Sequence, residues 1–292
     1  MNDMNGMQAG VETPRQDGAR DAVPCRGPAA PAGGALAAAR PFVARQFMVA
    51  LASVDAAGAA WASLVFGKPD FLRVSGADAI QIDTLQKERD LGDPLWDNLA
   101  LNRDIALLLL DPDSGRRCRM DGSVRRLDAR GLEVAVRALH PDCPGAVARR
   151  RLRQLGEARL PVQAAHGKAL RGGVGNIVRQ ADCVFVASRE GGAVAIAHRG
   201  GAPGLVELVD DTTLRLPGPP GAARDDARVG LCFHDLAHGQ LLQLSGSATP
   251  LPRQDAETRW EFRVDAWILR DTPQPMAWDD LDALPEDETA QA

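Results

Sequence analysis

The chain has 292 residues, of which 45% are hydrophobic and 25% charged, and its formal net charge is -5. At about 100–200 residues per domain, this length predicts one large or two modest globular domains. The acidic balance argues against a dedicated nucleic-acid-binding protein, and seven Phe, five Trp and no Tyr leave few rings for base stacking.

The cysteines and the apolar runs indicate the compartment. The five cysteines are scattered and form no CxxC pair, which predicts reduced thiols and a cytoplasmic protein. The longest unbroken aliphatic run, Ile105–Leu110, is far shorter than the roughly 20 apolar residues of a membrane span. No apolar run precedes Pro14, so we expect neither a secretory signal nor a membrane partner.

Both ends of the chain have the composition of disordered segments. Residues 1–38 are rich in Gly, Ala and Pro and are expected to form a disordered lead-in, because they cannot bury enough apolar surface to offset their ordering entropy. Residues 273–292 carry six carboxylates after Pro273 and are expected to form an acidic tail.

The most informative feature is an internal duplication, which sets the architecture. At an offset of 134 residues Arg45-Gln46 recurs as Arg179-Gln180, and Gly67 and Pro69 recur as Gly201 and Pro203. At an offset of 124, Leu107, Asp111 and Gly122-Ser123 match Leu231, Asp235 and Gly246-Ser247. The second copy has therefore lost ten residues between the two matched blocks.

Each copy consists of short apolar runs separated by Gly, Asp and Pro turns, which predicts strands of a barrel or sandwich. In the first copy these are residues 47–54, 61–66, 71–74 and 107–110, and a further strand through Gly122. Asp93 as N-cap and Pro94 as first residue predict one helix there, which the shorter second copy lacks. A second helix is expected over residues 145–155, linking the copies.

The expected organisation is a first half at 39–162, ending in the linker helix, and a second half at 163–272.

Several motifs in these halves resemble one family. Ala197–Val206, with His198-Arg199-Gly200-Gly201 and then Pro203-Gly204, resembles the signature of flavin-nucleotide-binding proteins of the pyridoxamine 5'-phosphate oxidase type. Val229–Asp235 and Leu244–Gly246 resemble a later block of the same family, and Trp61–Phe71 and Gly92–Leu95 resemble its N-terminal half.

The resemblance implies a mainly β fold in which two tandem split β-barrels of the FMN-binding type form a pseudo-dimer. In that fold FMN lies at the interface between barrels, and the chain is expected to form a homodimer or to act alone. The sequence departs from the pattern of this family in two places. Leu216–Gly221 replaces the family's Asn-rich segment that supplies phosphate ligands, and the C-terminal basic motif of vitamin B6 oxidases is absent, so we do not predict vitamin B6 oxidation.

The expected cofactor site is built around His198, Arg199, Gly200 and Gly201. An Arg fork beside glycines with no Cβ in the way suits a phosphate, and the alternative is a Gly-rich turn with a solvated Arg. Ser63 and Lys68 lie at the equivalent place in the first copy, where Lys68 either adds an anion contact or is simply solvated.

Other candidates are weaker. The resemblance places Arg117 near the flavin. The alternative is that Arg117 is a charged residue on an exposed edge of the sheet, where charge prevents pairing with another chain. Arg73, on the strand after the Lys68 turn, is a further candidate anion contact. His234 and His238 have helical metal-ligand spacing but fall on a β-turn, so no metal is predicted. Cys143 is either a reactive thiol or a structural residue.

Two classes of function follow. The first is an FMN-dependent oxidoreductase of unknown substrate and electron donor, in which the protein anchors the phosphate and the flavin performs the chemistry. The second is a non-catalytic split-barrel module that has lost flavin and binds another small ligand or a partner chain, which the ten-residue deletion favours. A purely structural duplicated β protein stays open as a third.

Overall fold

The computed structural model describes residues 30–86, 89–141, 147–190, 192–218, 227–252 and 258–281. Strands dominate, and every strand pairing is antiparallel. The first copy contains β1 (Ala30–Pro31), α1 (Ala32–Ala44), β2 (Met48–Val54), β3 (Ala60–Phe66), β4 (Leu72–Ser75), β5 (Ala79–Asp83), α2 (Leu95–Leu101), β6 (Asp104–Leu110), β7 (Arg117–Asp128) and β8 (Gly131–Pro141).

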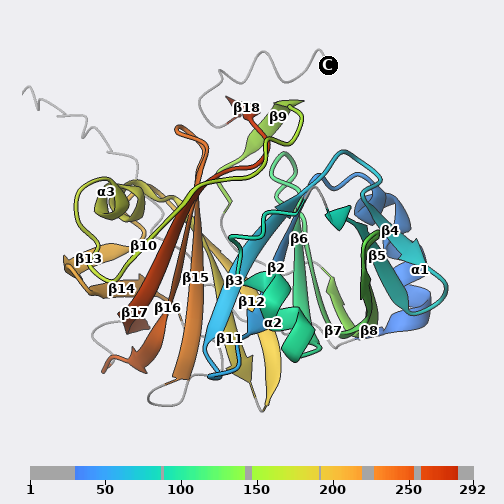
Figure 1. Cartoon of the computed structure of the whole chain (residues 1–292), viewed down its shortest axis with the longest axis horizontal. Helices are drawn as coiled ribbons and strands as arrows, with labels where there is room; N and C mark the ends of the chain where they lie inside the picture. Colours follow the sequence, from blue (N-terminus) through green and yellow to red (C-terminus); the bar gives the residue numbers. More distant parts are fainter. Residues whose placement is uncertain are drawn as a thin grey trace, which may run out of the picture.

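The second copy repeats the first. It contains β10 (Ala164–Gly167), α3 (Gly173–Gln180), β11 (Cys183–Glu190), β12 (Ala193–Gly200), β13 (Glu207–Asp210), β14 (Thr213–Pro217), β15 (Ala227–Asp235), β16 (Gln240–Pro250) and β17 (Arg259–Asp271). The strands β9 (Arg150–Leu155) and β18 (Met276–Asp280) pair in a ribbon of their own, above the two sheets in Figure 1.

The two sheets have the same strand order, which confirms the predicted tandem, mainly β architecture. The first runs β3-β2-β6-β7-β8-β5-β4 with β1 beside β8, and the second runs β12-β11-β15-β16-β17-β14-β13 with β10 beside β17. Figure 1 shows them side by side, with α1 and α3 on their outer flanks. The repeat therefore begins at β1 and α1, upstream of the predicted boundary at residue 39.

Three apolar cores explain the continuous apolar runs. One lies inside each copy and the third lies between them. Along β6, Ile105, Leu107 and Leu109 face the first core, whereas Ala106, Leu108 and Leu110 face the core between the copies. A strand buried on both faces is apolar throughout and shows no alternation of polar and apolar residues. The shared core joins the two copies as the predicted pseudo-dimer.

The strand register corrects the alignment of β2 with β11. An offset of 134 places Val49 on Cys183, but Val49 and Leu51 face the first core just as Val184 and Val186 face the second, an offset of 135. Because side chains alternate along a strand, a one-residue shift exchanges the two faces.

Three predicted segments are wrong in part. Residues 150–155 form β9 rather than a linker helix, and Arg150 and Arg153 pair with Asp182 and Asp279 across it. Residues 32–38 of the predicted lead-in belong to α1, whose Leu36 is fully buried. Residues 276–280 of the predicted tail form β18. Residues 1–29 and 282–292 of these end segments lie outside the described residues.

The predicted helix of the first copy is α2. It begins at Leu95, and Asp93 still caps it because its Oδ1 accepts from the Leu95 N–H at 2.9 Å. The segment of the second copy that would correspond, 219–226, lies outside the described residues. Within the part of the chain that the structure describes, no helix has both the length and the apolar character needed to cross a membrane.

Candidate functional site

The predicted site residues fall into two groups instead of one site, one around the end of β3 and one around β12. Ser63 contacts Asp93 and Gln243, and Lys68 contacts Glu157. Arg117 contacts His198, whose neighbour on β12 is Arg199. Since β3 corresponds to β12, the two groups occupy equivalent places between the copies.

The second group is a buried cluster of cations around a neutral His. The Arg117 Nη1 donates to His198 Nδ1 at 3.2 Å, so the His198 proton is on Nε2. The His198 ring packs edge-on against Phe185, with centroids 5.2 Å apart. Burial, reinforced by Arg117 and Arg199, lowers the pKa of His198 to about 3. This His is therefore a hydrogen-bond acceptor for Arg117 and carries no charge at neutral pH.

The glycines after Arg199 are committed to the fold. The Gly201 N–H donates to the Asp182 carbonyl at 2.8 Å, and a Cβ on Gly201 would lie 3.0 Å from Leu205. Gly200 pairs with Cys183 at the end of β12. The Gly201 amide predicted to hold a phosphate is thus already used to secure the strand end.

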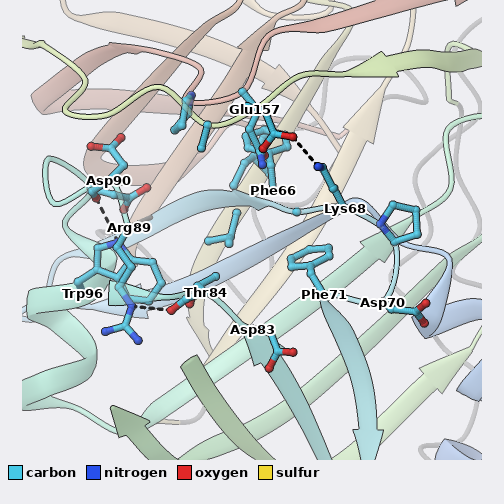
Figure 2. Close-up of a pocket in the computed structure, with 18 of the residues that line it drawn as sticks. Phe66, Lys68, Asp70, Phe71, Asp83, Thr84, Arg89, Asp90, Trp96 and Glu157 are labelled. Carbon is cyan, nitrogen blue, oxygen red and sulfur yellow. Dashed lines mark hydrogen bonds and ion pairs between the residues drawn. The ribbon is translucent and has the colours of Figure 1, made fainter. Parts of the chain in front are cut away.

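The first group borders a cavity of about 500 Å³ at the β3–β4 turn. An offset of 134 takes Leu64, Val65, Phe66 and Gly67 onto His198, Arg199, Gly200 and Gly201, and all four first-copy residues line this cavity. The second copy contributes Arg270, Pro273 and Gln274, and the linker contributes Glu157 and Ala158. In Figure 2, Asp90, Arg89 and Trp96 lie at one end and Lys68, Asp70 and Phe71 at the other.

A buried network from both copies supports the Asp90 end. Arg270, whose side chain is 1% exposed, pairs with Asp90 through Nη1 and with Asp93 through Nη2 at 2.7 Å. The same Nη2 donates to Gln243 Oε1 at 2.8 Å. The Ser63 hydroxyl donates to Asp93 Oδ1 at 2.6 Å. Two carboxylates thus share one guanidinium, which leaves the ionised network with a charge of -1.

Burial opposes the charges of this network. It raises the pKa of Asp93 to about 6, against hydrogen bonds from Ser63, Leu95 and Gln243 that favour the carboxylate. Burial also lowers the pKa of Arg270 to about 10, so the guanidinium stays protonated at neutral pH. Asp93 consequently changes its charge close to neutral pH.

The cations at the cavity rim have simple partners. Lys68 pairs with Glu157 at 2.6 Å, and both side chains are largely exposed. Arg73 pairs with Asp83. Arg89 stacks over Trp96, 4.9 Å from the ring centroid, and donates to the Thr84 carbonyl. Exposed ion pairs of this kind contribute only about 0–1 kcal/mol, so a ligand can replace them at small cost.

Three residues of the cavity wall carry buried polar atoms that have no hydrogen-bond partner among the described residues. They are Thr84 Oγ1, Arg270 Nε and Gln274 Oε1. Since buried polar groups in proteins are nearly always hydrogen-bonded, such atoms in a cavity wall point to a ligand with polar groups.

Asp90, Gln243 and Arg270 were not among the predicted site residues, and Asp93 was predicted only as a helix cap. Arg270 is 180 residues from Asp90 and 177 from Asp93, and no short motif joins them. The available signal was the resemblance, which implies a site at the interface between two barrels and therefore residues from both copies.

The remaining candidates do not form a reaction site. His238 pairs with Asp235 in a turn, and within the described residues no group of three His, Cys, Asp or Glu side chains is arranged to hold a metal ion. Cys118 and Cys232 are buried, and burial raises the pKa of Cys183 to about 12, so these thiols are inert. Cys143 lies outside the described residues.

Comparison with known proteins gives only distant similarity. No family model and no curated protein matches the chain. HupZ of group A Streptococcus matches over 38% of this chain and 97% of its own, at 14% identity and a TM-score of 0.28. A pyridoxamine 5'-phosphate oxidase candidate from Lactobacillus delbrueckii matches over 35% and 94%, at 12% identity and a TM-score of 0.28. An F420 reductase matches over 34% and 90%, at 16% identity and a TM-score of 0.25. At this level the similarity identifies neither a family nor a function.

Proposed function

We propose that the protein binds FMN in the cavity at the β3–β4 turn and acts as a flavin-dependent oxidoreductase on a small-molecule substrate. The observation that carries the proposal is the cavity of about 500 Å³ between the copies, lined by the first-copy counterparts of His198–Gly201. Cavities that hold small organic ligands typically measure about 300–1,000 Å³.

The residues present fit such a cofactor. Phe66, Phe71 and Trp96 provide apolar surface for a planar ring system. The orphaned atoms of Thr84 and Gln274 supply hydrogen-bonding capacity in the wall. Lys68 has one carboxylate partner among the described residues, so two of its three N–H donors remain for a phosphate.

In this proposal the chain binds and orients, and the bound flavin supplies hydride or electron transfer. Lys68 holds the phosphate at the open rim. Phe66 and Trp96 exclude water from the ring. Arg270, fixed by Asp90 and Asp93, keeps the polar end of the cavity in one arrangement. No side chain is assigned as a general acid or base.

The charge of the cavity favours one rival, a module that binds another small ligand. Among the described residues, five carboxylates (Asp70, Asp83, Asp90, Asp93 and Glu157) and four cations (Lys68, Arg73, Arg89 and Arg270) line it. This balance does not by itself attract an anion, and it suits a neutral or cationic ligand equally well.

The test is a titration of the purified protein with FMN and with riboflavin, which lacks the phosphate, followed by flavin absorbance and fluorescence. Lys68→Gln is expected to weaken FMN binding about tenfold and to leave riboflavin binding unchanged, because one charge-assisted hydrogen bond is lost. The matched control is Lys168→Gln, since Lys168 is exposed and does not line the cavity.

The results distinguish the flavin function from its rival, and the cavity from the second-copy site. Failure of both flavins to bind the wild type would reject the flavin function and favour the rival. Loss of FMN binding in Arg199→Ala but not in Lys68→Gln would move the flavin to the second-copy site, as the motif alone predicts.

A further inference from the structure

The two ends of the cavity differ in chemistry. Lys68 lies at one end and Asp90 at the other, with Phe66 between them in Figure 2. The Lys68 end presents an exposed ammonium. The Asp90 end presents the buried network with two carboxylates and one guanidinium. An elongated ligand is therefore held in one direction only.

Asp90 has spare hydrogen-bond acceptor capacity at the inner end of the cavity. Each carboxylate oxygen accepts about two hydrogen bonds. Asp93 is saturated, since Ser63, Leu95, Gln243 and Arg270 all donate to it. Asp90 accepts only one bond on each oxygen from the described residues, from the Gly92 N–H and from Arg270.

The orphaned atoms agree with this count. Thr84 Oγ1 accepts a hydrogen bond as readily as it donates one, and Gln274 Oε1 only accepts. Arg270 adds donors beside these acceptors, because its Nε–H has no partner among the described residues and its Nη1 keeps one hydrogen after the bond to Asp90. The inner end therefore offers several acceptors and a net negative charge to a ligand, beside the remaining donors of one guanidinium.

We propose that Asp90 forms an acceptor subsite for an N–H group, so that a bound flavin lies with the imide N–H of its pyrimidine ring toward Asp90 and its phosphate toward Lys68. This assignment rests on the proposed FMN function and adds the orientation of the ring. It also makes Asp90 a residue that selects ligands bearing an N–H donor at that position.

The experiment compares FMN with its N3-methyl derivative, in which the imide N–H is replaced by N–CH₃. Binding is measured by the quenching of flavin fluorescence, which needs no turnover. Methylation is expected to weaken binding to the wild type at least about tenfold, because Asp90 loses its donor and the methyl group meets a buried carboxylate. In Asp90→Ala, which removes both the acceptor and the bulk of the side chain, the two flavins are expected to bind within about twofold of each other.

The matched control is Asp70→Asn, a second carboxylate of the cavity, placed at the Lys68 end. Asn tolerates the left-handed backbone of Asp70, whose φ is 73°. This variant is expected to keep the full effect of methylation. Thermal unfolding of each variant shows whether it is folded.

The outcomes separate the two proposals. Equal binding of FMN and N3-methyl-FMN by the wild type would overturn the acceptor subsite and leave the flavin function standing. An undiminished methylation effect in Asp90→Ala would overturn the assignment to Asp90. If neither flavin binds the wild type, the flavin function itself is overturned, and the subsite with it.

Discussion

Protonation of His198 is predicted to destabilise the folded protein as the pH falls below 6.5. Its pKa is about 3 in the folded chain and about 6.5 when unfolded, because burial and the neighbouring Arg117 and Arg199 disfavour the imidazolium. Between these values the unfolded chain binds the proton more readily. The contribution of neutral His198 to stability is therefore present above pH 6.5 and is lost progressively toward pH 3.

The size of the effect follows from the pKa difference. Each unit is worth about 1.4 kcal/mol. At pH 5, about 1.5 units below the unfolded value, the loss is about 2 kcal/mol, which is a large part of the stability of an ordinary domain. The His198 side chain is only 5% exposed, so solvent screens this effect little.

The assay is urea unfolding followed by Trp fluorescence at pH 7 and pH 5. His198→Gln keeps an acceptor for Arg117 and removes the titration. From pH 7 to pH 5 the wild type is expected to lose about 2 kcal/mol more than this variant. The control His238→Gln, at an exposed His, is expected to behave as the wild type.

A single result would refute the reasoning. If the wild type and His198→Gln lose the same free energy of unfolding between pH 7 and pH 5, His198 does not remain neutral in the buried cluster, and its contact with Arg117 is not as described.

The remaining predictions concern packing and charge. Gly230→Ala is expected to cost on the order of 1–3 kcal/mol, because the new Cβ would lie 2.5 Å from the Ala60 carbonyl of the other copy. Gly239→Ala, in open space at a φ of 64°, is expected to cost about 1 kcal/mol. If Gly239→Ala lowers the free energy of unfolding more than Gly230→Ala does, the close contact of Gly230 with the other copy is not as described. Arg270→Met is expected to cost about 3–5 kcal/mol at pH 8 and less at pH 5, where Asp93, whose pKa burial raises to about 6, is protonated; an equal cost at both pH values argues against the shared guanidinium. Each is measured by urea unfolding.

Much of the fold was predictable because it depends on local patterns. Short apolar runs between Gly and Pro turns predict strands, and matched glycines such as Gly67 and Gly201 reveal the duplication. The prediction of a linker helix was wrong because helix propensity is a weak preference that tertiary contacts override. Arg150 and Arg153 extend as β9 since Asp182, Asp279 and strand β18 provide their partners.

The candidate site was predictable only by half. The sequence placed Ser63 and Lys68 at the counterpart of the His198 motif, and the cavity lies there. The resemblance placed Arg117 near the flavin, and in the structure Arg117 contacts His198 at 3.2 Å, which was not predicted. The sequence did not indicate that the Ser63–Lys68 group and the His198 group form separate sites. A motif in one copy does not show which residues of the other copy lie beside it.

The sequence by itself determined that the protein is a duplicated β structure, since strand and turn preferences are set by neighbours along the chain. Only the tertiary structure decided which faces of the strands meet and which side chains share the cavity. Asp90 and Arg270 are 180 residues apart, and burial between two copies joins them and shifts the pKa values around them. Those energies arise from the packed interface, which no local pattern encodes.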